Sequence, residues 1–353
     1  MSVDNSNMLL RKALELTPLG AQTFSKSYRY YCEGISPSFI ERGDGCYLWD
    51  IDGNKYLDYV CALGPVTVGY NDPRVNRAIM RQLEKGIVFS QPASISVELA
   101  EKITEVVPCA EMVRFVKNGS DATSAAVRLA RAYTGREVVL ASGYHGMQDW
   151  YVGATANNKG VPKAVSSLTR MFTYNDLAHL ENLFEQYSGE VACVILEPIQ
   201  GDGPLEGYLE NVKRLTEQQG AILIFDEVVS GFRYALGGAS ELYKVVPDLA
   251  AFGKGMANGM PISAVAGRRE LLKQIESGVF ISTTFGGEAL SMAAALETIR
   301  ILQEPGVYDH LWNLGKRMLS GLRNIIESNN LQTVILTSGL APHSGVLFNG
   351  EGE

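Results

Sequence analysis

The sequence predicts an α/β fold in which helices pack on a mainly parallel β-sheet. From Val113 onward, short apolar runs alternate with longer amphipathic segments, which is typical of parallel strands joined by helices. Two of the runs, 221–225 and 249–252, are too short for helices and read as fully buried strands. Asp226 follows the first run and Lys254 the second. Because the carboxyl ends of parallel strands meet at one edge, we expect both side chains there.

The size and charge of the chain limit the classes of protein to which it can belong. Its 353 residues exceed the usual limit of about 250–300 residues for one core, so we expect a large domain and a smaller part. We place the N-terminal segment and hairpin of the small domain at 1–60, the large domain at 61–303 and the start of an incomplete C-terminal small domain at 304–353. A net charge of −8 without a basic run argues against nucleic acid as a partner.

The sequence also argues against a membrane or secreted protein. No segment approaches the roughly 20 apolar residues of a membrane span, and the N-terminus lacks the apolar core of a signal peptide. Five cysteines without a CxxC motif suit free thiols in a reducing compartment. We therefore expect a cytoplasmic protein.

The individual elements follow from local patterns. A short helix is expected within 5–30, and alternating apolar residues around a turn at 52–54 predict a hairpin over 45–60. Helices follow at about 72–86 and 96–107. The rest of the chain is expected to form strands at about 113–116, 137–141, 191–196, 221–225, 249–252, 262–266 and 332–336, and helices at about 120–134, 175–187, 206–219, 268–277, 288–303 and 307–328.

The pairing of an amine with a carboxylate at one sheet edge suits catalysis with pyridoxal phosphate (PLP). Lys254 can hold the aldehyde of PLP as a Schiff base. Asp226 can keep the pyridine nitrogen protonated, so that the ring withdraws electrons from a carbanion. Each residue also has an ordinary interpretation, because Lys254 lies in a Gly-rich loop typical of surface lysines and Asp226 is equally consistent with helix capping or a metal role.

A phosphate-binding site is predicted where the strand at 113–116 meets the next helix. Gly119 permits a close backbone approach, Ser120 offers a hydroxyl, and a helix N-terminus supplies free N–H groups. An ordinary helix cap fits the same residues. Asp121 must point away from a phosphate for the site to bind it.

Other strand ends carry further polar or aromatic groups. Tyr144, in the turn that also contains His145, can stack on a flat heterocycle, and Val228 can cover the opposite face. A core aromatic and a helix-facing aliphatic residue are the alternatives for these positions. Glu197 and Gln200 follow another strand, and a second Gly-rich turn with hydroxyl groups spans 282–287.

Seven segments, in this order, resemble the class III (fold type I) PLP-dependent aminotransferases. They read FIERGDGCYLWDIDGNKYLDYV, KNGSDATSAAVRLARAYTGRE, YHGMQDW, LEPIQGDG, FDEVVSGFR, AFGKGMANGMPISAVAG and TTFGGEALSMAAA. The resemblance extends from about Phe39 to Leu336. Within this family the chain is most similar to glutamate-1-semialdehyde aminomutases and their relatives in cell-surface sugar clusters.

The resemblance implies PLP as the cofactor and a role for each site residue. Lys254 would form the internal aldimine and move a proton between the substrate Cα and C4′ of the cofactor, and Asp226 would pair with the pyridine nitrogen. Val228 and Tyr144 would lie on opposite faces of the ring. Thr284 of a neighbouring subunit would bind the phosphate, which implies a homodimer with shared active sites. The implied cofactor-binding residues are Gly119, Ser120, Tyr144, His145, Glu197, Asp226, Val228, Lys254 and Thr284, with Gln200 in support of Glu197.

The chain departs from the family pattern at several positions. Asn118 stands where Ser is usual, and Glu288 where Asn is common. The aminomutases hold the substrate carboxylate with an Arg of the N-terminal segment, which assigns this role to Arg29, with Lys26 as the alternative. Relatives continue beyond residue 336 into a small domain that closes over the site, and most of that domain is expected to be missing here.

These observations predict an enzyme that moves an amino group from a donor such as glutamate to an aldehyde or ketone acceptor. An intramolecular amino shift, catalysed by glutamate-1-semialdehyde 2,1-aminomutase, is the alternative on the same machinery. The short segment 154–165 favours transfer. The shortened C-terminal part raises a further alternative, a PLP-binding scaffold with little activity. No metal is expected at the site.

Overall fold

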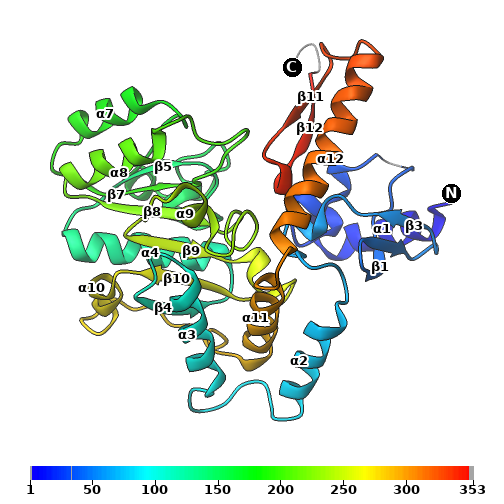
Figure 1. Ribbon diagram of the computed structural model, residues 1–353, viewed down its shortest axis with the longest axis horizontal. Helices are drawn as coiled ribbons and strands as arrows, with labels where there is room; N and C mark the ends of the chain where they lie inside the picture. The colour runs from blue at the N-terminus through cyan, green and yellow to red at the C-terminus, as the bar shows by residue number, and fades with distance from the viewer. Residues whose placement is uncertain (1, 33, 350–353) are drawn as a thin grey trace.

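The chain folds around one central sheet, with an N-terminal sheet and a C-terminal helix and hairpin to one side of it (Figure 1). This computed structural model describes residues 2–32 and 34–349. The sheet belongs to the segment predicted to form the large domain. The two terminal parts lie to its right in Figure 1, in blue and in orange to red.

The strands of the central sheet are buried apolar segments that meet side by side. In sheet order they are β4 (Met112–Val116), β10 (Ser263–Gly267), β9 (Leu249–Phe252), β8 (Ile222–Glu227), β7 (Val191–Leu196), β5 (Val138–Ser142) and β6 (Thr169–Met171). The strands from β9 to β6 pair in parallel, whereas β10 is antiparallel to both β9 and β4. The prediction of a mainly parallel sheet is therefore confirmed.

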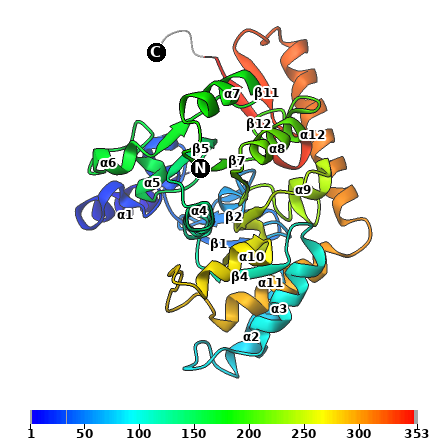
Figure 2. The ribbon, with the colours of Figure 1, turned by 90° about the vertical axis from the view of Figure 1, so that its left-hand side faces the viewer.

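Helices cover both faces of this sheet, which explains why its strands are apolar on both sides. Val138 and Leu140 of β5 pack into one core, and Val139 and Ala141, which alternate with them, pack into the other. The first core includes helices α3 (Ile95–Val106), α7 (Leu177–Gln186), α8 (Tyr208–Gln218) and α11 (Ala289–Leu302), and the second includes α4 (Gly119–Thr134), α5 (Asp149–Val152) and α10 (Arg269–Leu272). Figure 2 looks along α4, with β5 and β7 between it and α7.

The N-terminal part consists of α1 (Asp4–Leu16) and an antiparallel sheet of β1 (Ile40–Asp44), β2 (Tyr47–Asp50) and β3 (Lys55–Leu57). The predicted hairpin is the β2–β3 pair. Asp50 stabilises its turn, because the carboxylate accepts hydrogen bonds from the Asn54 amide at 2.8 Å and the Tyr56 hydroxyl at 2.7 Å. Burial acts to raise the pKa of Asp50, but these hydrogen bonds outweigh it and lower that pKa.

Several elements differ from the prediction. The helix expected at 268–277 is wrong in extent, because α10 ends at Leu272 and a 3₁₀ turn continues only to Ile275. The strand expected at 332–336 begins later, as β11 (Ile335–Ser338), and pairs with β12 (Gly345–Phe348). Apart from β1 and β12, the strands and α-helices that were not predicted have only three to six residues each. Segments this short do not show a clear periodic pattern of apolar residues. They are β6, α5, α6 (Lys163–Ser166) and α9 (Gly238–Tyr243).

Two longer helices complete the fold. They are α2 (Pro73–Leu83) and α12 (Val307–Ser328). Asp72 caps α2 by accepting a hydrogen bond from the Arg74 amide at 2.8 Å, as the sequence Asp72-Pro73 suggests. Within the described ranges, no helix is both long enough and apolar enough to cross a membrane.

Candidate active site

The predicted lysine and aspartate lie at the same edge of the sheet. Strands β8 and β9 are parallel neighbours, and Asp226 of β8 is opposite Ala251 of β9. Lys254 follows two residues after the end of β9 and has a φ of 35°, in the left-handed region. Burial lowers the pKa of Lys254; the nearby carboxylates of Asp226 and Glu197 oppose this shift without cancelling it. A larger fraction of this amine is therefore neutral at a given pH.

Asp226 is held by a buried histidine, His145, one of the cofactor-binding residues that the family resemblance implies. The Nδ1 atom of His145 lies 2.8 Å from Asp226 Oδ2, and the two residues are 1% and 3% exposed. The other carboxylate oxygen accepts a hydrogen bond from the Val228 amide at 3.0 Å. His145 Nε2 is buried without a hydrogen-bond partner among the described residues. The carboxylate thus has a fixed orientation at the strand end.

The predicted phosphate-binding site lies at the N-terminus of α4, where an ordinary helix cap was the alternative interpretation. Asn118, rather than Ser120, is the N-cap, and its side chain accepts a hydrogen bond from the Asp121 amide at 3.0 Å. The carboxylate of Asp121 accepts hydrogen bonds from the preceding Lys117 and Asn118 amides, both at 3.3 Å. The carboxylate of Asp121 is therefore engaged away from Gly119 and Ser120, as phosphate binding requires.

Gly119 is needed for more than flexibility, because it touches Val228. A methyl group at Gly119 would lie 2.9 Å from Val228 Cγ1, closer than packed carbon atoms approach. Ser120 faces the turn after β5, where its Oγ accepts a hydrogen bond from the Met147 amide at 3.1 Å. The structure therefore brings together the helix N-terminus, Val228 and the turn that carries Tyr144 and His145.

Glu197 and Tyr144 meet at the ends of β7 and β5. The carboxylate of Glu197 accepts a hydrogen bond from the Tyr144 amide at 2.8 Å. Burial and the neighbouring Asp226 raise the pKa of Glu197. Gln200 lies close by, with Nε2 at 3.3 Å from Ser142 Oγ. Tyr144 is 65% exposed in this single chain, and its ring packs against Tyr151 in an edge arrangement.

Two predicted residues are not joined to this cluster within one chain. Arg29 lies in a short helical turn, Tyr28–Tyr30, and Thr284 lies in the second Gly-rich turn; both are exposed. Among the described residues, no hydrogen bond connects either side chain to Asp226 or Lys254. Their roles in binding substrate and phosphate stay predictions.

Sequence reasoning missed three residues that shape the site. Glu227 is fully buried and accepts hydrogen bonds from the Ala239 and Ser240 amides, each at 2.9 Å, which anchors the start of α9 beneath the end of β8. Arg233 and Asn258 bind a segment far away in the sequence. Glu227 and Arg233 belong to the quoted segment FDEVVSGFR and Asn258 to AFGKGMANG, but only the fold reveals their contacts.

The chain is similar to known proteins in both sequence and fold. The family described as aminotransferase class-III matches residues 31–340. The chain belongs to the class III aminotransferases. A glutamate-1-semialdehyde 2,1-aminomutase from Methanothrix thermoacetophila is 39% identical, with 99% of this chain and 83% of that protein covered.

Solved structures agree with this membership of the class III aminotransferase family. The PLP internal aldimine form of the FumI protein of Sphingopyxis sp. MTA144 has a TM-score of 0.88 at 31% identity, over 98% of this chain and 84% of that one. An omega-transaminase from Sphaerobacter thermophilus has a TM-score of 0.87 at 29% identity, over 98% and 83%. The protein is thus a fold type I, PLP-dependent enzyme that acts on small molecules, either as an aminotransferase or as an aminomutase.

Proposed function

We propose that Lys254 is the reactive amine of this class III aminotransferase and that Asp226 supports the pyridine nitrogen of PLP. The observation that carries the proposal is the position of both residues at adjoining ends of β8 and β9. Gly119 and Ser120 would hold the phosphate at the N-terminus of α4, with Thr284 of a second subunit. Val228 and Tyr144 would contact the two ring faces, and Glu197 the ring hydroxyl.

Several features of this chain fit PLP. The buried carboxylate of Asp226 is oriented by two hydrogen bonds, and no lysine or arginine lies within ion-pair distance as a cationic partner among the described residues. A protonated pyridine nitrogen would supply that partner. Gly119 occupies a position where a side chain would collide with Val228, which leaves the backbone open to a phosphate.

When bound, PLP withdraws electrons from the bond to be broken at the substrate Cα. The protein's own residues would do the rest. Lys254 would take the proton from the substrate Cα and deliver it to C4′ of the cofactor, a task that suits an amine whose pKa is lowered by burial. His145 would keep Asp226 in place, and Val228 would exclude water from one side of the ring.

For the reaction we propose transfer of an amino group from a donor such as glutamate to an aldehyde or ketone. The donor would depart as its 2-oxo acid, and the acceptor would leave as an amine, so that atoms and charges balance over the two halves. Arg29 is our candidate for binding the carboxylate of the donor. An intramolecular shift is an equal candidate, because the 39% identical relative is a glutamate-1-semialdehyde 2,1-aminomutase.

We also propose a homodimer with shared sites, and the division into parts at 1–60, 61–303 and 304–353. Large apolar side chains on the surface of the single chain support the dimer. They include Phe24 at 74% exposure, Tyr59 at 72% and Phe285, next to Thr284, at 56%. Burial of such residues is a usual feature of homodimer interfaces.

The visible spectrum of the PLP-loaded protein tests the proposal. We expect a yellow protein whose colour fades when glutamate is added, with release of 2-oxoglutarate and transfer of its labelled nitrogen to an added keto or aldehyde acceptor. Conversion of glutamate 1-semialdehyde without any acceptor would instead assign the aminomutase reaction. Lys254→Ala should abolish the covalent hold on PLP and all turnover. Turnover that survives in this variant would remove the lysine from its role.

A further inference from the structure

The backbone from Cys61 to Gly69, called here the 61–69 segment, is unusual where it passes Lys254. Four consecutive residues have φ values in the left-handed region: Cys61 at 49°, Ala62 at 56°, Leu63 at 72° and Gly64 at 96°. This conformation is unfavourable for every residue except glycine. Such a turn persists only when the surrounding structure holds it, and it is typical of functional sites.

Gly64 brings this turn against the lysine itself. A methyl group at Gly64 would lie 3.7 Å from Lys254 Cδ and 3.4 Å from Arg233 Nη2. One residue after the lysine, a methyl group at Gly255 would lie 2.9 Å from Thr67 Oγ1. The 61–69 segment therefore forms a wall along the aliphatic part of Lys254 and along the backbone that follows it.

Arg233 holds the beginning of this wall. Its Nη2 donates a hydrogen bond to the Gly64 carbonyl, and its Nε donates to the Val229 carbonyl at 3.3 Å. The side chain is buried, and no carboxylate pairs with it among the described residues. A buried guanidinium without a counter-charge is costly to the fold, so a structural role alone is a weak explanation for it.

Asn258 holds the other end. Its Oδ1 accepts hydrogen bonds from the Thr67 amide at 2.9 Å and the Val68 amide at 3.1 Å, and its Nδ2 donates to the Gly69 carbonyl at 2.9 Å. One side chain thus satisfies three backbone groups about 190 positions away. Asn258 is itself left-handed, with φ 46°, and ends the 3₁₀ turn that begins at Lys254.

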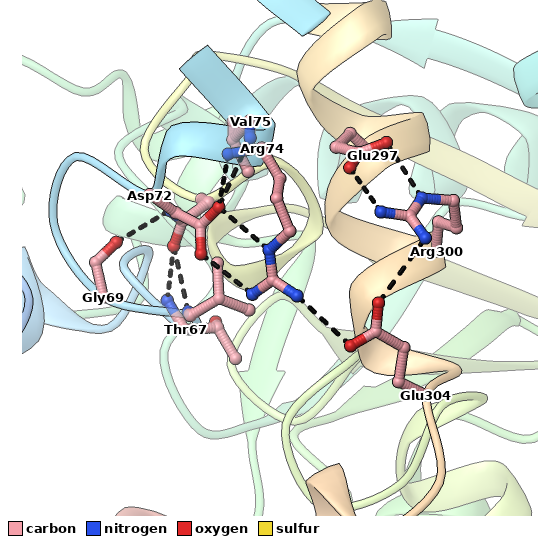
Figure 3. A network of polar contacts seen from close by, with 10 residues as sticks. Thr67, Gly69, Asp72, Arg74, Val75, Glu297, Arg300 and Glu304 are labelled. Carbon is pink, nitrogen blue, oxygen red and sulfur yellow. Dashed lines mark hydrogen bonds and ion pairs between the residues drawn. The ribbon is translucent and has the colours of Figure 1, made fainter. Parts of the chain in front are cut away.

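A network of ion pairs lies just after the 61–69 segment in the chain. Figure 3 shows Thr67 and Gly69 beside Asp72 and Arg74, which begin α2. Arg74 pairs with Asp72 at 2.9 Å and with Glu304 at 3.2 Å, and Glu304 also contacts Arg300 of α11 at 3.4 Å (Figure 3). The 61–69 segment is therefore held by Arg233 and Asn258, and the helix that follows it is anchored at its start by Glu304.

We infer that Asn258 and Arg233 are positioning residues, which hold the 61–69 segment as a rigid wall that confines Lys254 to its reactive position. The inference rests on the proposed role of Lys254. Neither residue is placed in contact with PLP, so both act through the wall. Small displacements of a reacting group are costly, and a shift of about 1 Å can reduce turnover by roughly 100-fold.

The wall also keeps water from the lysine. Burial is the largest influence on the pKa of Lys254, and the charged groups that act on it are Asp226, Glu197 and Arg233. His343, near the C-terminal hairpin, also faces this pair, because Arg233 and Lys254 add to the effect of burial in lowering the pKa of His343. If the wall loosens, water enters and the lysine pKa rises towards its ordinary value. Because only the neutral amine attacks an aldehyde, the pH at which PLP capture is half-maximal should then move upwards.

The test compares Asn258→Gly with Asn330→Gly. Glycine removes the side chain of Asn258 without imposing strain at its positive φ. Asn330 is the matched control, since it also has a positive φ, 54°, but is exposed beyond the end of α12. In Asn258→Gly we expect faster hydrogen exchange at Thr67 and Val68 in the PLP-free protein. We also expect a higher half-maximal pH for PLP capture and a kcat lower by about 10- to 100-fold, with KM less affected.

Asn258→Asp provides a second variant in case the glycine variant fails to fold. It keeps the acceptor for Thr67 and Val68 but replaces the donor to Gly69 with a carboxylate oxygen, which repels the Gly69 carbonyl. Because the added negative charge can itself raise the lysine pKa, hydrogen exchange and kcat are the measurements that count in this variant, and both should change in the same direction as in Asn258→Gly. If exchange quickens in either variant while the capture profile and kcat match those of the control, the wall does not position the lysine and the inference is wrong. If the unaltered protein captures no PLP at any pH, the proposed function fails instead.

Discussion

At the scale of single residues, the site depends on how buried charges are compensated. Asp226 is 3% exposed and touches a histidine whose second nitrogen has no partner among the described residues. Burying such groups without a counter-charge is unfavourable. A protonated pyridine nitrogen bound at Asp226 would supply a cation to this buried carboxylate, in addition to the amine of Lys254, which already interacts with it.

We expect Asp226→Ala to retain PLP through Lys254 but to lower kcat by about 100-fold or more, because the ring loses the charge that stabilises its electron-withdrawing form. PLP content from the visible spectrum and steady-state kinetics measure the two effects separately. Asp44→Ala, at an exposed position at the end of β1, is the control. Full kcat in Asp226→Ala would contradict the pairing with the pyridine nitrogen.

At the scale of elements, the N-terminus of helix α4 contains both a side-chain cap and the proposed phosphate site. Its cap uses Asn118 and Asp121, whose side chains engage the backbone around the first turn. The amides of Gly119 and Ser120 lie between these partners and would be available to a phosphate. The cap forms without PLP, so the proposed phosphate site would already be in place when the cofactor binds.

Removing this cap should weaken the helix measurably. Asn118→Ala is expected to lower the free energy of unfolding of the PLP-free protein by about 1 kcal/mol, because the Asp121 amide loses its acceptor. Urea denaturation measures the difference. Asn118→Ser retains a side-chain acceptor and should stay close to the unaltered protein. Equal losses in both variants would mean that the cap does not contribute to stability.

At the scale of the whole molecule, the proposed assembly explains the exposed position of Thr284. The turn that carries it packs on the end of β4 near Phe115, and Phe285 beside it is 56% exposed. We expect two chains of 38.4 kDa each to form a dimer in which this turn reaches the phosphate site of the partner. Sedimentation equilibrium checks the mass.

Mixing variants checks the shared site. In a mixed dimer of Lys254→Ala and Thr284→Ala chains, one site contains both native residues and the other contains neither. Tight PLP binding should therefore reappear after the two variants are unfolded and refolded together, and not when each is refolded alone. If the mixture binds no better than the separate variants, Thr284 acts within its own chain or not at all.

Much of this architecture could be predicted from the sequence, because buried strands leave continuous apolar runs. Those of β7, β8 and β9 were recognised to within one or two residues, and the lysine and aspartate followed from their ends. The direction of β10 could not be predicted, since an apolar run reads the same in parallel and antiparallel pairs. β6 was missed because a strand of three residues is too short to show an alternation of apolar and polar side chains.

The supporting contacts were beyond sequence reasoning for a different reason. The His145–Asp226 pair joins residues 81 positions apart, and Asn258 binds amides 191 and 190 positions away. No local pattern encodes such distances. Gly119 was predicted for close approach to a phosphate, but its contact with Val228 depends on how α4 sits against the end of β8.

The burial of the central sheet on both faces has a practical consequence for protein engineering. Interior positions of the strands accept little besides apolar residues, so new chemistry has to be introduced in the turns at one edge. The preference for an acceptor, or the choice between intermolecular amino transfer and an intramolecular amino shift, can be altered by grafting these turns onto an unchanged scaffold. The 61–69 segment offers a starting point for such grafts, with its anchors at Arg233 and Asn258 retained.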